Sequence, residues 1–224
     1  MPQVSVAENG SAFVVEATRE HGPAPIVGNL KAPPGVTMKL KRRMPPDPQL
    51  PRAFVPPSGE LEIASLAEAG EYGLATSLEK WEKVLVTQNP APLMERPRLG
   101  ELPWTNAARC FLARVRFHTF PWGKAVLFLT TYAQESVRGP VNNSTLTLTV
   151  QGVTHDRKYA VKGHFEIRHP ALPDTLWQRG EVYFDIVRAG PQVEAWLDRQ
   201  PDEAFQPTVA DYIRFLEAVK ITRP

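Results

Sequence analysis

Hydrophobic and polar residues alternate along the stretch from residue 106 to residue 173, and this alternation predicts four antiparallel strands. A period of two is typical of a half-buried strand, because successive side chains leave opposite faces. The second run, residues 125–132, is apolar on both faces, as in an interior strand that is covered on two sides. The first run, residues 109–118, is expected to place on one face the side chains of Phe111, Ala113, Val115 and Phe117.

The third and fourth runs are expected to form a hairpin whose turn lies at residues 154–157. In residues 145–150, leucine and valine alternate with threonine. In residues 159–167, aromatic and aliphatic side chains are expected to face the core, with Gly163 as the one gap. The residues between them are expected to face water: Lys158, Lys162, His164, Glu166 and Arg168.

Three segments show the hydrophobic spacing of amphipathic helices. Thr76 and Glu79 have capping-box spacing at the start of the first helix, which Asn89-Pro90 ends. The second is expected to begin at Gly190-Pro191, and Thr208 is expected to cap the third. Together with the sheet, these helices predict an α+β fold: an antiparallel β-meander sheet packed by helices. Shorter alternating runs favour further strands at residues 12–18, 36–41, 60–65 and 181–188.

Prolines divide the chain into two predicted parts. Eleven of the 23 prolines precede residue 58, where few periodic apolar positions accompany them. We therefore expect residues 1–58 to form a proline-rich, extended N-terminal arm with one or two short strands, and residues 59–224 to form an α+β sandwich domain. A basic cluster within the arm has two interpretations, a solvated run of charges or a docking site for an acidic partner or anionic surface. It consists of Lys39, Lys41, Arg42 and Arg43.

Composition narrows the classes of function. The 26 basic and 24 acidic residues nearly cancel, so no global field favours nucleic acid, and we expect no nucleic-acid partner. No run of residues reaches the ~18 apolar positions of a transmembrane helix. A single cysteine, Cys110, excludes an intrachain disulfide framework. Residues 1–10 lack a basic start and an apolar signal core, which suits either a cytoplasmic protein or a mature exported chain.

Candidate catalytic and metal-binding groups are sparse. His164 and Glu166 share a strand face, but zinc usually has three or four protein ligands, so His118 or Asp156 would have to complete the set. His155 beside Asp156 suits general-base chemistry, although aspartate is also common in turns. No serine lies in a Gly-x-Ser-x-Gly elbow, and no glycine-rich phosphate loop occurs. We therefore expect no catalytic residue, no metal and no cofactor.

Loops of the sheet supply the candidate binding residues. Asn142-Asn143 predicts an Asx-type turn, or alternatively part of a binding surface, because loops on a rigid sheet often carry function. With the basic cluster and two further loops, the candidate partner-binding residues are Lys39, Lys41, Arg42, Arg43, Trp122, Asn142, Asn143 and His155.

An ordered set of short motifs carries a family resemblance. The motifs are Asn106-Ala107-Ala108, the strand that ends at His118, residues 129–134, Asn142-Asn143, residues 151–154 and residues 169–173. In this order and spacing, residues 101–173 resemble a group of uncharacterised bacterial exported proteins, often lipoproteins. The hairpin departs from the pattern, because Asp156-Arg157 stands where Asp-Gly is expected. The resemblance implies an extracytoplasmic location, in the periplasm or associated with the cell envelope. The layout of elements is also loosely similar to the α+β sandwich of the PsbP/Mog1 group.

These observations favour a non-catalytic, extracytoplasmic binding or accessory domain that recognises a protein partner or a cell-envelope component. One alternative is a hydrolase that uses His155, Asp156, His164 or Glu166. Another is a structural subunit of a larger assembly, in which the arm reaches onto a neighbour.

Overall fold

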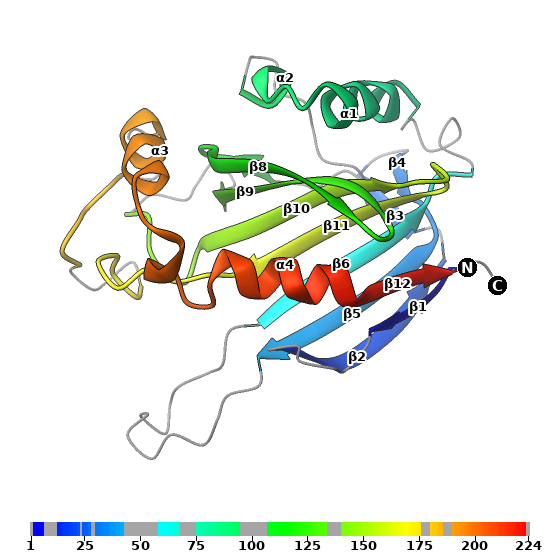
Figure 1. The fold of residues 1–224 in the computed structure, drawn as a ribbon, viewed down its shortest axis with the longest axis horizontal. Coiled ribbons are helices and arrows are strands. Elements are labelled where there is room, and N and C mark those ends of the chain that lie inside the picture. Colours follow the sequence, from blue (N-terminus) through cyan, green and yellow to red (C-terminus); the bar gives the residue numbers. More distant parts are fainter. Residues whose placement is uncertain are drawn as a thin grey trace.

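A large antiparallel sheet with helices on both sides forms the protein (Figure 1). The computed structural model describes residues 2–6, 13–22, 24–27, 30–42, 58–67, 75–94, 107–133, 140–175, 180–185 and 190–222. Its eight-stranded sheet contains, in spatial order, β2 (Phe13–His21), β5 (Gly35–Arg42), β6 (Ser58–Ser65), β11 (Tyr159–Glu166), β10 (Leu146–Thr154), β9 (Gly123–Ala133) and β7 (Ala108–Arg109), with β8 (Ala113–Phe120) also paired to β9. Two small ribbons pair β1 (Gln3–Val6) with β12 (Val219–Thr222) and β3 (Ala24–Val27) with β4 (Leu30–Ala32). The expected α+β class with an antiparallel sheet is confirmed.

The predicted meander is the run β8–β9–β10–β11, in which each strand pairs with its neighbour in sequence. The interior strand β9 is buried from Ala125 to Thr131, as its continuous apolar sequence predicts. The hairpin turn also lies where the sequence indicates it, since the backbone N–H of Arg157 donates to the carbonyl of Thr154 at 2.9 Å. Local alternation therefore predicts the strands and the turns of this half of the sheet.

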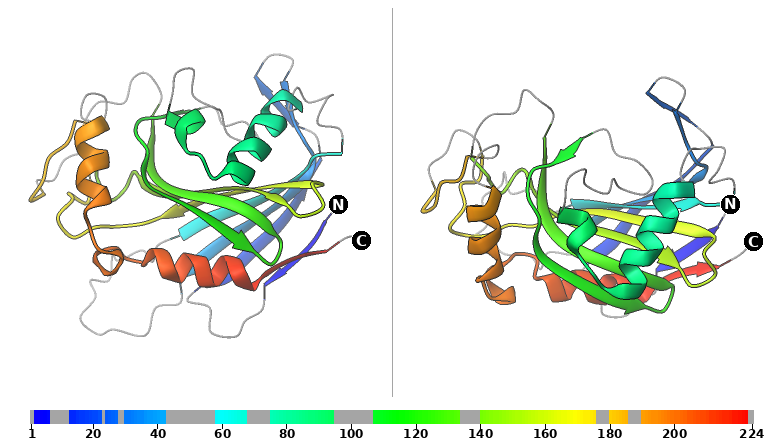
Figure 2. Two further views of the ribbon diagram at one scale, coloured as in Figure 1. Left: turned by 45° about the horizontal axis from the view of Figure 1, so that its top comes forward. Right: turned by 90° about the horizontal axis from the view of Figure 1, so that it is seen from above.

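Helices lie on the two opposite faces of the sheet (Figure 2). On one side are α1 (Ala75–Thr87) and α2 (Ala91–Met94), and on the other is α4 (Val209–Ala218), with α3 (Gly190–Asp198) and a short 3-10 turn (Asp202–Ala204) leading to it. The α4-side core includes Tyr212, Phe215 and Leu216. The α1-side core includes Trp81, Leu85 and Phe128. The fold therefore has two hydrophobic cores, one on each face of the sheet.

The capping box predicted for the last helix is present. The Thr208 hydroxyl accepts from the Asp211 backbone N–H at 3.1 Å, and the Asp211 carboxylate accepts from the Thr208 backbone N–H at 3.0 Å. The first helix differs in one detail: α1 begins at Ala75, so Thr76 lies inside the helix rather than at its cap.

A β-bulge in β8 overturns the expected faces of the first strand. Ala113 and Arg116 stand opposite Leu129 and Leu127 of β9, so three steps along β8 match two along β9. The extra residue reverses the alternation. Phe111 and Ala113 therefore belong to the α4-side core, whereas Val115 and Phe117 pack on the α1-side core. The prediction that all four share one face is wrong.

The same bulge joins β8 to helix α3. The backbone N–H groups of Leu112 and Arg114 donate to the carboxylates of Glu194 and Asp198 of the helix, at 2.7 and 2.5 Å. The Arg114 guanidinium donates to the carbonyls of Leu197 and Gln200 and forms an ion pair with Asp202. The Arg116 guanidinium also donates a hydrogen bond to the Asp202 carboxylate. This hydrogen bond and the positive charges of Arg116 and Arg114 lower the pKa of Asp202 below its ordinary value. Helix side chains thus complete the hydrogen bonding of the irregular part of β8.

The structure does not show the expected N-terminal arm. Strands β2 and β5 belong to the main sheet, and β5 pairs with β6 on its other side. Met38 and Leu40 of β5 are buried in the α4-side core. Residues 43–57 lie outside the described residues. Within the described part of residues 1–58, β2 and β5 therefore belong to the main sheet, whereas β1, β3 and β4 lie in the two small ribbons.

Two smaller expectations also change. Residues 180–185 contain no strand beyond an isolated bridge between Pro140 and Asp185, and residues 186–189 lie outside the described part. The face of β11 that we expected to contact water is half-buried. On it, the Lys162 ammonium forms an ion pair with the Glu62 carboxylate of β6 at 3.0 Å. Within the described residues, no helix is long and apolar enough to cross a membrane.

Candidate functional site

The predicted partner-binding residues are scattered through the structure. Lys39 and Lys41 are exposed on β5, where Lys39 stands opposite Glu60 of β6. Arg42 ends that strand, and Arg43 lies outside the described residues. Within the described residues, Lys39 and Lys41 of the basic cluster therefore lie at the surface.

Trp122 is an interior residue. Only 6% of it is exposed, its indole N–H donates to the Leu216 carbonyl at 2.9 Å, and its ring stacks on Phe120. It therefore fixes the β8–β9 turn to α4 and offers almost no surface to a partner.

Asn142 and Asn143 are buried as well. The side-chain amide oxygen Oδ1 of Asn142 accepts from the Ser144 backbone N–H at 2.9 Å, which confirms the predicted Asx turn. The Asn143 side chain accepts from the His169 N–H at 2.8 Å and donates to the carbonyls of His169 and Leu172. Since these bonds tie the loop before β10 to the chain after β11, the structure gives both asparagines a structural role.

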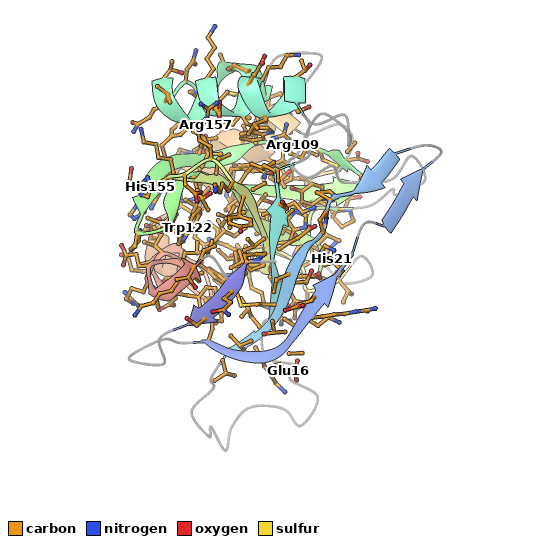
Figure 3. The ribbon with its side chains drawn as sticks, turned by 90° about the vertical axis from the view of Figure 1, so that its right-hand side faces the viewer. Glu16, His21, Arg109, Trp122, His155 and Arg157 are labelled. Atoms are coloured by element: carbon orange, nitrogen blue, oxygen red, sulfur yellow. The ribbon has the colours of Figure 1, made fainter. Side chains whose placement is uncertain are left out.

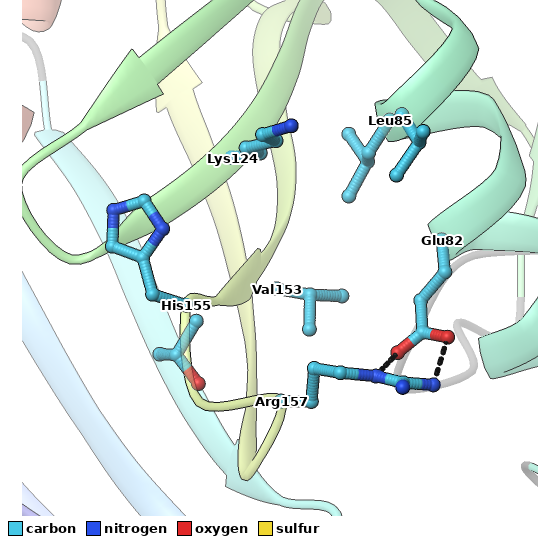
Figure 4. A pocket seen from close by; sticks show the side chains of 8 residues that line it. Glu82, Leu85, Lys124, Val153, His155 and Arg157 are labelled. Atoms are coloured by element: carbon cyan, nitrogen blue, oxygen red, sulfur yellow. Dashed lines mark hydrogen bonds and ion pairs between the residues drawn. The ribbon is translucent and has the colours of Figure 1, made fainter.

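His155 is exposed and lines an open pocket between α1 and the β10–β11 hairpin (Figures 3 and 4). The pocket has a volume of about 290 Å³. Val153 and Lys124 stand opposite each other on β10 and β9, so their side chains share the face that α1 covers. We call this site the hairpin pocket; its lining residues are Glu82, Leu85, Val86, Lys124, Val153, Thr154, His155 and Arg157.

The wall of the hairpin pocket is an ion pair between the turn and the helix. Nε and one terminal nitrogen of Arg157 donate to the two carboxylate oxygens of Glu82, in the parallel geometry drawn in Figure 4. The hydrogen bond and the negative charge of Glu82 raise the pKa of Arg157. The guanidinium is thus engaged and positioned, with 68% of its side chain exposed.

The floor of the pocket is apolar and its rim is polar. Leu85 and Val153 are buried, while Val86 is 68% exposed at the edge. Lys124 is exposed, and the described residues include no carboxylate within ion-pair distance of it. Because Glu82 balances the charge of Arg157, the Lys124 ammonium gives the lining a surplus positive charge. Such a site suits a ligand that combines a negative group with an aliphatic one.

The groups expected for general-base catalysis are not arranged as a dyad. Nε2 of His155 lies 3.2 Å from the Phe120 carbonyl, to which it can donate as N–H. The Asp156 carboxylate instead accepts from the Thr154 hydroxyl at 2.8 Å and from the Lys158 N–H at 3.1 Å. His164 lies further along β11, roughly 20 Å from the turn at ~3.3 Å per residue. Within the described residues, no three metal-ligating side chains gather at one point.

Sequence reasoning identified one residue of the hairpin pocket, His155, and missed its other lining residues. Glu82 and Arg157 are 75 positions apart, so no local periodicity joins them. The one available signal was Asp156-Arg157 in place of Asp-Gly in the hairpin.

Comparisons with known proteins found no match: no protein-family model, no curated protein and no solved structure matches the chain.

Proposed function

We propose that this protein is a non-catalytic binding or accessory domain, and that it recognises a protein partner or a cell-envelope component through the hairpin pocket. The observation that carries the proposal is the pocket itself, which opens to solvent above an apolar floor and holds Lys124, for which the described residues supply no ion-pair partner, beside the positioned pair of Glu82 and Arg157. An extracytoplasmic location is part of the proposal and rests on the resemblance of residues 101–173 to exported bacterial proteins.

The hydrolase alternative is less well supported. It requires His155, Asp156, His164 or Glu166 to act together, yet the Asp156 carboxylate is engaged within its own turn. A catalytic histidine is typically oriented by a third group within hydrogen-bond reach of its imidazole. The arrangement therefore favours binding over catalysis at this site.

Site-specific photo-crosslinking tests the proposal. The full native gene product, carrying a photoreactive benzoylphenylalanine in place of Val86, is expressed in source cells, which are irradiated and fractionated. Tyr183 is the matched control position, because it is exposed to nearly the same extent, 69% against 68%, but does not line the hairpin pocket.

The expected result is a crosslinked partner in the envelope fraction from position 86 and none from position 183. Recovery of uncrosslinked protein from both positions in every fraction would refute a partner-binding role for this surface. A partner crosslinked equally from both positions would support binding but move it away from the pocket.

A further inference from the structure

We propose that the hairpin pocket binds an acidic side chain of the partner together with a neighbouring aliphatic one, and that Arg157 occupies a strained backbone position in order to build the pocket. This inference rests on the proposed binding function and specifies the chemistry of the ligand.

The backbone of Arg157 is the first argument. Its φ is 60°, in the left-handed region where glycine is the default residue. A hairpin turn followed by one left-handed residue is common, and glycine normally takes that position. An arginine there is strained, and its largely exposed side chain adds nothing to either core. Strain of this kind persists where the surrounding structure holds it, and such positions cluster at functional sites.

The contacts of Arg157 show what the strain achieves. Its fork-like pairing with Glu82 ties the hairpin to α1, and both residues line the pocket. A glycine would relax the backbone but would remove this wall. The ion pair that forms this wall therefore accounts for an arginine at the strained position.

The charge of the lining is the second argument. Glu82 neutralises Arg157, which leaves the Lys124 ammonium as the attractive group for an anion. Leu85, Val86 and Val153 supply an aliphatic surface beside it. A carboxylate next to Lys124, with an aliphatic side chain on that surface, satisfies both parts of the site.

The dimensions favour a peptide segment over a larger compound. A volume of about 290 Å³ lies at the lower limit of small-molecule sites, which span roughly 300–1,000 Å³. The pocket is open, and Val86 at its edge is exposed, so adjoining parts of a partner can continue along α1. One or two side chains of a linear segment therefore fill it.

A peptide-display selection on the full chain tests this directly. Random linear peptides are selected on the wild-type protein, and the affinities of enriched peptides are measured by fluorescence polarisation. The variants are Lys124→Glu, Arg157→Gly and, as a matched charge-reversal control at an exposed lysine of β12, Lys220→Glu. Each enriched peptide is also made with its acidic residues replaced by the corresponding amides.

We expect peptides that place aspartate or glutamate next to leucine, isoleucine or valine. Lys124→Glu should weaken their binding about tenfold, because it replaces attraction by repulsion, and the amide peptides should lose a similar factor. Arg157→Gly should keep the folded stability of the wild type yet weaken binding, whereas Lys220→Glu should bind as the wild type does.

Three results would overturn the inference: no enrichment of acidic peptides, equal binding by wild type and Lys124→Glu, or undiminished binding by Arg157→Gly. Acidic peptides that bind wild type and Lys124→Glu equally would still leave a binding function intact, at another surface of the protein. The crosslinking experiment decides that broader function independently, so the two failures are distinguishable.

Discussion

Replacing Asn143 by alanine should destabilise the protein substantially, although Asn143 lies in a loop that the sequence marks as a candidate binding surface. The side chain is 5% exposed and joins residues 26 and 29 positions away along the chain. Alanine removes the acceptor of the His169 N–H and the donor that the carbonyls of His169 and Leu172 share.

The structure sets the size of the effect. A buried N–H left without an acceptor costs about 1–3 kcal/mol, and each further hydrogen bond contributes about 1 kcal/mol net. The two carbonyls add less to this cost than the N–H does. A buried carbonyl that lacks a donor is tolerated better in proteins than a buried N–H that lacks an acceptor. We therefore expect Asn143→Ala to lower the free energy of unfolding by about 2–4 kcal/mol.

Urea denaturation, followed by tryptophan fluorescence and by circular dichroism, measures this loss. Asn143→Asp is the informative companion, because it keeps the acceptor for the His169 N–H but turns a second oxygen toward the carbonyls and Asp174. It should be at least as destabilising as alanine. A loss below about 0.5 kcal/mol for Asn143→Ala would refute the structural role and return the residue to the candidate binding surface.

Three further predictions concern other parts of the fold. Thr208→Ala should cost about 1 kcal/mol of stability in urea, because it removes one half of the capping box of α4; an unchanged midpoint would contradict this. Asp202→Asn should cost about 2 kcal/mol, since Arg114, whose side chain is 6% exposed, loses its counter-ion; a smaller loss than for the more exposed Arg116→Met would contradict this. Burial lowers the pKa of His169 from its ordinary 6.5, so folding favours the neutral ring: stability should be complete above pH 6.5 and fall as the pH drops toward the folded pKa. Unfolding in urea from pH 8 to pH 5 checks this, and His169→Gln should flatten the slope.

The strands of the meander could be predicted from sequence because each depends on residues close together in the chain. Alternation in residues 145–150 and 159–167 specifies which side chains face the core, and a turn of four residues joins them. The same holds for α4, whose cap and apolar stripe lie within one short segment. In such elements, the faces predicted by the hydrophobic periodicity agree with the faces that the fold buries.

The edge of the sheet could not be predicted in this way. One extra residue near Arg114 reverses the faces of β8, and only the pairing with β9 and the carboxylates of α3 reveals it. The place of strands β2 and β5 in the sheet also depends on long-range pairing, which local sequence does not show. Their sequence permits a strand, but their place in the sheet depends on pairing with β6, which follows a proline-rich stretch.

Local sequence by itself determined the meander, the C-terminal helix and the α+β class, because short-range periodicity and capping specify those elements. Only the tertiary structure decided where the candidate function lies. It buried Trp122 and both asparagines, left His155 and Lys124 at the surface, and brought Glu82 of α1 against Arg157 of the hairpin. The reason is that a pocket depends on contacts between residues far apart in the chain, and no local pattern encodes those distances.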